Sequence, residues 1–236
     1  MSFVFVDLNF NDNDQELVNS ILITNVSDTL EYYGILDRIT LKNLLRVHIS
    51  QIGNDINKST KIANLLLDKI IEPYLKATDK NYLWFKMQVI PPNNLFDIPR
   101  WHTDGYFYDS KYYADNNLPQ TKLAGVLKGE STLFKENDNE MRNIYRETWE
   151  SSFVNGKYDP IIDMENRKIL DEKLVNYNTL SVPKNHAAIF IVGSKDKSAV
   201  HSEPRIKTMR LFYSIVSGTK NEIADLAKNW NKIFNA

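Results

Sequence analysis

Between Tyr82 and Ser217 the apolar residues occur in short runs that are separated by turn-forming residues. The runs are rich in aromatic and β-branched side chains, which favour strands. They read YLWFKMQVI, RWHTDGYFY, KLAGVL, STLF, AAIFIV, SAVHSE and MRLFYSIV. Parallel strands need long crossover connections, usually helices, and most of these runs follow one another without one. The series therefore indicates an all-β sandwich or barrel.

Helical patterns flank this β-rich region on both sides. After a first strand candidate, FVFVDLNF, residues 15–75 predict helices with apolar stripes and an end near Pro73. Thr219 and Glu222 fit a capping box at the start of a C-terminal helix. We expect an α+β fold with a mainly β core in a single domain, 1–236. Its parts are an N-terminal strand and helical support (1–80), the β core (81–218) with a partly helical insertion (135–180), and the C-terminal helix (219–236).

Composition excludes several classes of site and partner. The 236 residues include no cysteine, so disulfides and thiolate metal sites are excluded and any metal must be bound by His, Asp or Glu. The net charge of −1 argues against a nucleic-acid partner. The N-terminus lacks a basic start, and the apolar run AAIFIV is far shorter than the ~20 residues that span a bilayer. We expect a soluble cytoplasmic protein without a membrane partner.

The segment RWHTDGYFYDS, residues 100–110, places His102 and Asp104 two positions apart. On a strand both side chains point to the same face, where an imidazole nitrogen and a carboxylate oxygen can bind a divalent ion. A second histidine would complete the two-histidine, one-carboxylate arrangement, which leaves three positions open. Alternatively, Asp104 and Gly105 form the centre of a hairpin turn, which would separate the two side chains. The tripeptide alone favours the turn.

A second stretch, SAVHSEPRIKTMRLFYSIV, changes that balance. His201 ends one predicted strand, and Arg210 opens the next strand nine residues later. The order of these residues resembles the iron(II)- and 2-oxoglutarate-dependent oxygenases, whose pattern is H-x-D, a long gap, a second His and an Arg about ten residues on. WHTDG is similar to the phytanoyl-CoA-hydroxylase-like branch, and the prolyl-hydroxylase-like branch is the other candidate. The resemblance covers about Tyr82 to Ser217 and favours the metal site over the turn.

The resemblance implies a double-stranded β-helix, that is, a jelly-roll or cupin-like fold. His102, Asp104 and His201 would bind Fe(II), and Arg210 would bind the distal carboxylate of 2-oxoglutarate, because a guanidinium matches a carboxylate in two hydrogen bonds. Phe212 stands where one large branch has a serine, so the second partner of that carboxylate is open. The candidates for it are Lys86, Gln88 and Ser214.

Other residues near these motifs have competing interpretations. His186, in the turn VPKNH, competes with His201 as the third ligand, but it has no arginine at the expected distance, and we prefer His201. His48 lies in a helical region and is assigned a structural role. Arg205 is interpreted as a solvated turn residue, with a substrate contact as the alternative. Four tyrosines either cover the substrate or pack onto the insertion: Tyr106, Tyr108, Tyr112 and Tyr113.

The implied activity is hydroxylation, or demethylation, with dioxygen as the oxidant and succinate and carbon dioxide as co-products. A small molecule, an amino acid or a peptide or protein side chain are all compatible substrates. Three alternatives stay open: a metal-dependent cupin-type enzyme that does not use 2-oxoglutarate, a catalytically silent binding module of the same fold, and an unrelated α/β protein with a chance H-x-D. The missing βαβ rhythm argues against the last of these. The sequence predicts no particular oligomeric state.

Overall fold

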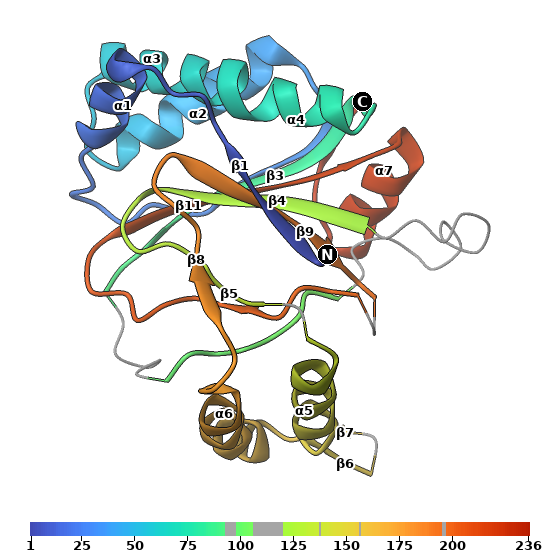
Figure 1. The fold of residues 1–236 in the computed structure, drawn as a ribbon. Coiled ribbons are helices and arrows are strands. Elements are labelled where there is room, and N and C mark those ends of the chain that lie inside the picture. Colours follow the sequence, from blue (N-terminus) through green and yellow to red (C-terminus); the bar gives the residue numbers. More distant parts are fainter. Residues whose placement is uncertain (93–97, 106–119, 137, 156, 195–196) are drawn as a thin grey trace.

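The computed structural model describes residues 1–92, 98–105, 120–136, 138–155, 157–194 and 197–236. In this part of the chain, two main sheets face one another (Figure 1). The larger sheet has the order β1-β9-β4-β11-β3-β2-β12, and the smaller sheet has the order β10-β5-β8. The larger sheet contains β1 (Phe3–Asp7), β2 (Leu30–Ile35), β3 (Tyr82–Ile90), β4 (Gln120–Lys128), β9 (His186–Val192), β11 (Arg210–Gly218) and β12 (Phe234–Asn235). The smaller sheet contains β5 (Leu133–Lys135), β8 (Thr179–Ser181) and β10 (His201–Ser202).

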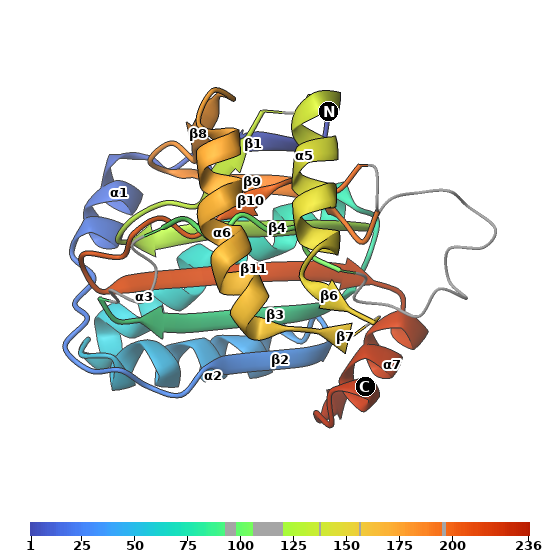
Figure 2. The same ribbon diagram turned by 90° about the horizontal axis from the view of Figure 1, so that it is seen from below.

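Helices cover both outer sides of this pair of sheets. Figure 1 shows α1–α4 over the larger sheet, α5 and α6 beyond the smaller sheet, and α7 at one end. Figure 2, seen from below, shows α5 and α6 lying across the strands. The helices are α1 (Asp12–Asn19), α2 (Arg38–Gln51), α3 (Ile56–Leu66), the π-helical turn η1 (Leu67–Ile71), α4 (Glu72–Ala77), α5 (Asn139–Glu150), α6 (Pro160–Leu174) and α7 (Lys220–Asn229). The short hairpin of β6 (Phe153–Val154) and β7 (Lys157–Tyr158) lies between α5 and α6. None of the helices in the described residues is both long and apolar enough to cross a bilayer.

The chain path is that of a double-stranded β-helix. Starting from β3 in the larger sheet, the chain reaches His102, which forms a bridge to β10 of the smaller sheet. It then passes through β4 (larger), β5 and β8 (smaller), β9 (larger), β10 (smaller) and β11 (larger), and the pairings among these strands are antiparallel. The α+β jelly roll expected from the sequence is therefore confirmed.

Alternation along β11 decides which side chains enter the space between the sheets. Leu211, Tyr213 and Ile215 belong to the apolar core that packs under the helices on one face of the larger sheet. Arg210 and Phe212, on the opposite face, line a cavity between the sheets. Because side chains alternate along a strand, the register of β11 places the arginine inside the jelly roll.

Three expectations about element boundaries are wrong. Residues 15–75 are not helical throughout, because β2 pairs with β3 within them. Pro73 does not end the helix: the chain widens into η1, with the Glu72 N–H donating to the Leu67 carbonyl, and Pro73 then lies in the first turn of α4, where its missing N–H is tolerated. The C-terminal helix begins at the predicted capping box but ends at Asn229, and β12 follows it.

Candidate metal centre

The structure brings His102, Asp104 and His201 together at one end of the space between the sheets. Asp104 Oδ1 lies 3.9 Å from His102 Nε2 and 3.8 Å from His201 Nε2. The two imidazole rings are 4.3 Å apart, centre to centre. The bridge between His102 and His201 fixes this arrangement, because each N–H donates to the other residue's carbonyl at 2.9 Å. The H-x-D pair therefore points to one place, as a metal site requires.

Both histidines are oriented by the same local hydrogen bond. His102 Nδ1 donates to the Arg100 carbonyl at 2.8 Å, and His201 Nδ1 donates to the Ala199 carbonyl at 3.1 Å. A carbonyl oxygen only accepts, so each Nδ1 carries a proton and Nε2 is the ring nitrogen that faces Asp104. Such bonds to the second ring nitrogen are the usual support of metal-binding histidines. Burial, with a contribution from His102, lowers the pKa of His201 to about 4, which keeps this imidazole neutral near pH 7.

A lysine completes the polar contacts of Asp104. Lys122, on β4, donates to Asp104 Oδ2 at 2.9 Å and leaves Oδ1 facing the two histidines. Burial is the largest single influence and acts to raise the pKa of the Asp104 carboxyl. The charge and hydrogen bond of Lys122, together with the charges of His201 and His102, outweigh it and hold that pKa below its usual range. The carboxylate is therefore ionised at neutral pH and available to a cation.

The three side chains line a cavity of about 130 Å³. Its wall contains Lys86, Gln88, His102, Asp104, Lys122, Ala124, Thr132, Phe190, His201, Glu203, Arg210 and Phe212. Arg210 is 1% exposed, and two hydrogen bonds hold its guanidinium: Nε donates to the Glu130 carbonyl and Nη2 donates to Thr132 Oγ1, both at 2.8 Å. Burial lowers the pKa of Arg210 to about 10, so the group stays charged at neutral pH.

The other predicted residues are placed as follows. Lys86 and Gln88 line the cavity from β3, and burial together with Lys122 lowers the pKa of Lys86. Ser214 is buried on β11, opposite Lys86 in register, outside the residues that line the cavity. The roles of these three residues toward 2-oxoglutarate stay predictions.

His186, His48 and Arg205 are not among the residues that line the cavity. His186 is the first residue of β9, pairs with Asp7, and its Nδ1 donates to the Lys184 carbonyl at 2.9 Å. His48 is buried on α2, and Arg205 is exposed in the segment between β10 and β11. The four tyrosines between residues 106 and 113 lie outside the described residues.

Three polar residues of the cavity wall were not predicted from the sequence: Lys122, Thr132 and Glu203. Lys122 shares its strand face with Ala124, so a charged residue at an inward position of KLAGVL was the available signal. Thr132 directly follows the turn that contacts Arg210. Glu203 lies two residues after His201; burial acts to raise the pKa of its carboxyl, but the charges of His102 and Arg210 lower it below its usual value.

The donor set fits a divalent ion of the first transition series. Two neutral imidazoles and one carboxylate are the ligands of mononuclear iron(II) oxygenase sites. Adjacent ligand atoms of an octahedral ion with bonds of about 2.1 Å lie about 3 Å apart. The separations of 3.8 and 3.9 Å therefore require each ligand atom to move by less than about 1 Å, which rotation of the side chains supplies.

This chain is similar in structure to several solved proteins. No family model and no curated protein sequence matches the chain. Solved structures do match. HygX from Streptomyces hygroscopicus, with nickel and 2-oxoglutarate bound, is 12% identical with a TM-score of 0.45, over 92% of this chain and 83% of that one. The dioxygenase for auxin oxidation in rice is 7% identical, TM-score 0.41, over 91% and 67%. A Pseudomonas putida prolyl-4-hydroxylase is 8% identical, TM-score 0.36, over 92% and 92%. These matches include enzymes of the kind that the sequence resembles, but likenesses this distant assign no activity to the chain.

Proposed function

We propose that this chain is an iron(II)- and 2-oxoglutarate-dependent oxygenase. It would hydroxylate, or demethylate, a substrate and release succinate and carbon dioxide. One observation carries the proposal: a single cavity contains both the converging ligand atoms of His102, Asp104 and His201 and the buried guanidinium of Arg210. Bound iron and 2-oxoglutarate supply the activation of dioxygen, while the protein binds, orients and excludes water.

The protein's own residues have distinct tasks in this proposal. His102, Asp104 and His201 hold the metal and leave coordination positions open. Arg210 binds the distal carboxylate of 2-oxoglutarate with the donors that Glu130 and Thr132 do not use, since a guanidinium has five N–H groups. We favour Thr132 as the second residue that binds this carboxylate. Its hydroxyl oxygen accepts a hydrogen bond from Arg210, so the hydroxyl proton is left to donate to the carboxylate.

The cavity size limits how the substrate binds. About 130 Å³ is less than the roughly 300–1,000 Å³ of typical sites for drug-sized ligands. We infer that 2-oxoglutarate and the reacting end of the substrate fill the cavity, while the rest of the substrate lies outside it. A small molecule, an amino acid or a peptide or protein side chain stays the proposed substrate class, and a cytoplasmic location stays the proposed setting.

A thermal-shift experiment on metal-free protein tests the assignment. Mn(II), an iron substitute that does not turn over, and 2-oxoglutarate should together raise the free energy of unfolding by about 2.7 kcal/mol at a hundredfold excess over the dissociation constant. His102→Ala should lose this stabilisation, because one of three metal ligands is missing. An unshifted wild type, or an equal shift in His102→Ala, contradicts the proposal.

Two further arms separate the alternatives. A cupin-type enzyme that does not use 2-oxoglutarate would respond to Mn(II) alone and show no additional shift with 2-oxoglutarate. A silent binding module would bind both and form no succinate with iron(II) and dioxygen in a screen of candidate substrates. Succinate formation should require His201 and survive His186→Ala, the matched control outside the cavity.

A further inference from the structure

The two segments that carry the histidines join the sheets through a small number of backbone hydrogen bonds. Before His201, the Ala199 N–H donates to the Ile191 carbonyl of β9, and the Val200 carbonyl accepts from the Lys135 N–H of β5, both at 3.0 Å. β10 consists of His201 and Ser202 alone, and His102 joins the smaller sheet through a single isolated bridge. Asp104 adds one backbone hydrogen bond, in which its carbonyl accepts from the Gly193 N–H at 2.9 Å. A ladder this short contributes few hydrogen bonds to the position of three metal ligands. Contacts from outside the sheets add to these bonds.

The helical insertion supplies apolar contacts to the back of both segments. Trp101 and Val200 each precede a ligand histidine and point away from the cavity, because side chains alternate on extended chain. Both are at least 95% buried, in one cluster with residues of α5 and α6. The buried members of this cluster are Trp101, Met141, Tyr145, Leu170, Leu174 and Val200.

Two polar contacts connect the insertion to the H-x-D segment itself. The Thr103 N–H, between the two ligands, donates to Tyr145 Oη of α5 at 3.0 Å, and Thr103 Oγ1 lies 3.2 Å from the same oxygen. Trp101 Nε1 donates to Asp171 Oδ1 of α6 at 2.9 Å. Lys135 Nζ lies 4.7 Å from the centre of the Trp101 ring and also donates to the Leu174 carbonyl at the end of α6. Each helix therefore holds a neighbour of the metal ligands.

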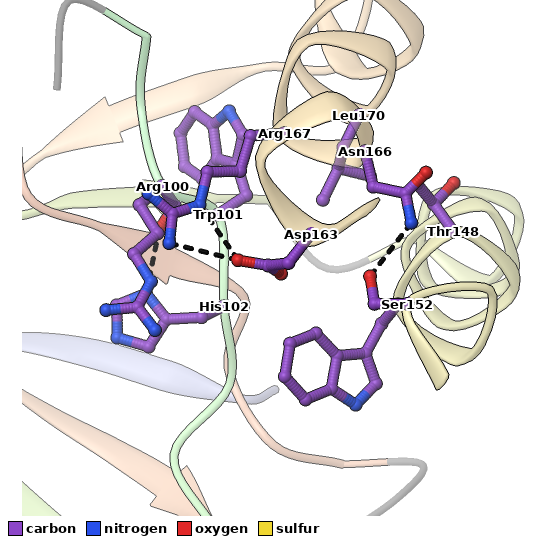
Figure 3. Close-up of a pocket in the computed structure, with 10 residues that line it drawn as sticks. Arg100, Trp101, His102, Thr148, Ser152, Asp163, Asn166, Arg167 and Leu170 are labelled. Carbon is purple, nitrogen blue, oxygen red and sulfur yellow. Dashed lines mark hydrogen bonds and ion pairs between the residues drawn. The ribbon is translucent and has the colours of Figure 1, made fainter. Parts of the chain in front are cut away.

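Figure 3 shows how closely the insertion approaches His102. A second, smaller cavity lies behind the His102 imidazole. Its volume is about 20 Å³, enough for about one water molecule. On the α6 side, Asp163 pairs with Arg167 at 3.0 Å, and Asn166 donates to Ser152 Oγ at 2.8 Å (Figure 3). A substrate does not fit between the insertion and the ligand.

From these contacts we propose that the α5–α6 insertion is a buttress that sets the metal affinity, with Tyr145 and Asp171 as its positioning residues. The inference rests on the proposed metal site. Partners that orient ligands from behind typically change metal affinity 10- to 100-fold when they are removed. Tyr145 fixes the backbone between His102 and Asp104, and Asp171 fixes the indole that precedes His102.

The test measures Mn(II) binding by titration, with free Mn(II) followed by electron paramagnetic resonance, in folded metal-free protein without turnover. Tyr145→Phe and Asp171→Asn should each weaken the affinity at least about tenfold. Tyr177→Phe is the matched control for the first variant, since the Tyr177 hydroxyl bonds Glu140 instead of the ligand segment. Glu172→Gln, exposed on the same helix, is the control for the second. Both controls should keep the wild-type affinity.

The outcomes separate this inference from the proposed function. A merely structural role would lower the stability of the metal-free variants and leave the dissociation constant of the folded protein unchanged, so affinities within twofold of wild type overturn the inference. A wild type that binds no Mn(II) overturns the proposed function itself. Hydrogen exchange of the wild type needs no variant: Mn(II) should slow amide exchange in α5 and α6 as well as at the ligands. Slowing confined to the ligand segments also overturns the inference.

Discussion

The Asp104 carboxylate uses its two oxygens in different ways. Oδ1 faces both histidines, while Oδ2 accepts from Lys122 at 2.9 Å. This division presents a single oxygen to a metal ion and partly neutralises a buried charge when no metal is bound. Loss of this contact should lower the free energy of unfolding measurably, because breaking a buried ion pair leaves one charge without its partner.

Replacement of Lys122 by methionine should destabilise the metal-free protein by about 3 kcal/mol at pH 7. Without the lysine, burial is opposed only by the two histidines, so the pKa of Asp104 should rise. The variant then regains stability as the pH falls through that raised pKa, whereas the wild type keeps its carboxylate charged until below pH 3.8. Urea unfolding in a chelator between pH 7 and 4.5 should show the gap closing. Lys122→Arg should show little gap, and a gap independent of pH contradicts the argument.

Thr132 offers a second test at the scale of one residue. Thr132→Val keeps the shape of the side chain but removes the hydroxyl that accepts from Arg210. We expect the affinity for 2-oxoglutarate, measured by calorimetry in the presence of Mn(II), to fall about tenfold, since a hydrogen bond to a charged group contributes about 1.5 kcal/mol or more. Thr208→Val is the control, because that hydroxyl bonds Glu130 on the exposed side. Equal losses in both variants would refute the assignment.

Among the elements, the turn between β4 and β5 determines where Arg210 lies. Gly129 has a φ of +97°, and a Cβ there would come within 2.8 Å of the Arg210 Cα. Gly129→Ala should therefore cost about 1–3 kcal/mol of stability through backbone strain and also weaken 2-oxoglutarate binding by displacing Arg210. Chemical unfolding and calorimetry measure the two effects. Gly105→Ala is the matched control, because its Cβ would meet no atom within 4 Å; a similar loss there contradicts the explanation.

How much of an element the sequence predicts depends on the range of the interactions that form it. The strands β3, β4, β9 and β11 are predictable because their own composition favours strands. The segment LEYYGI of β2 is not, since Tyr32, Tyr33 and Gly34 are all buried and a strand covered on both faces loses its alternation. β12 depends on parallel pairing with β2 across about 200 residues, which no local pattern encodes.

The same distinction between local and long-range interactions applies to the residues of the candidate site. The spacing of His102 and Asp104 predicts a shared face because it acts within one strand, and His201 with Arg210 follows the order of a known family. Lys122 meets Asp104 from 18 residues away, and Tyr145 meets Thr103 from 42 residues away, through sheet pairing and the insertion. Such contacts are set by the tertiary fold, so the sequence alone does not predict them.

Across the whole molecule, a buried imidazole lies on each side of the larger sheet. His201 faces the cavity between the sheets, and His48 lies on α2 in the helical layer. Burial lowers the pKa of both from the usual 6.5, that of His201 to about 4. Each of these two imidazoles therefore binds a proton less readily in the folded protein than in the unfolded chain.

The sign of the resulting pH dependence follows from this difference. Above pH 6.5 both states hold the two imidazoles neutral, and stability does not depend on them. Below pH 6.5 the unfolded chain binds protons that the folded chain does not, so the free energy of unfolding falls by up to about 1.4 kcal/mol per pH unit for each histidine until its folded pKa is reached. Denaturant unfolding of metal-free protein between pH 7 and 5 should show this slope, and His48→Gln should remove the share that belongs to the helical layer. If the slope is the same in wild type and His48→Gln, protonation of His48 does not oppose folding, and the acid sensitivity of the molecule must arise elsewhere.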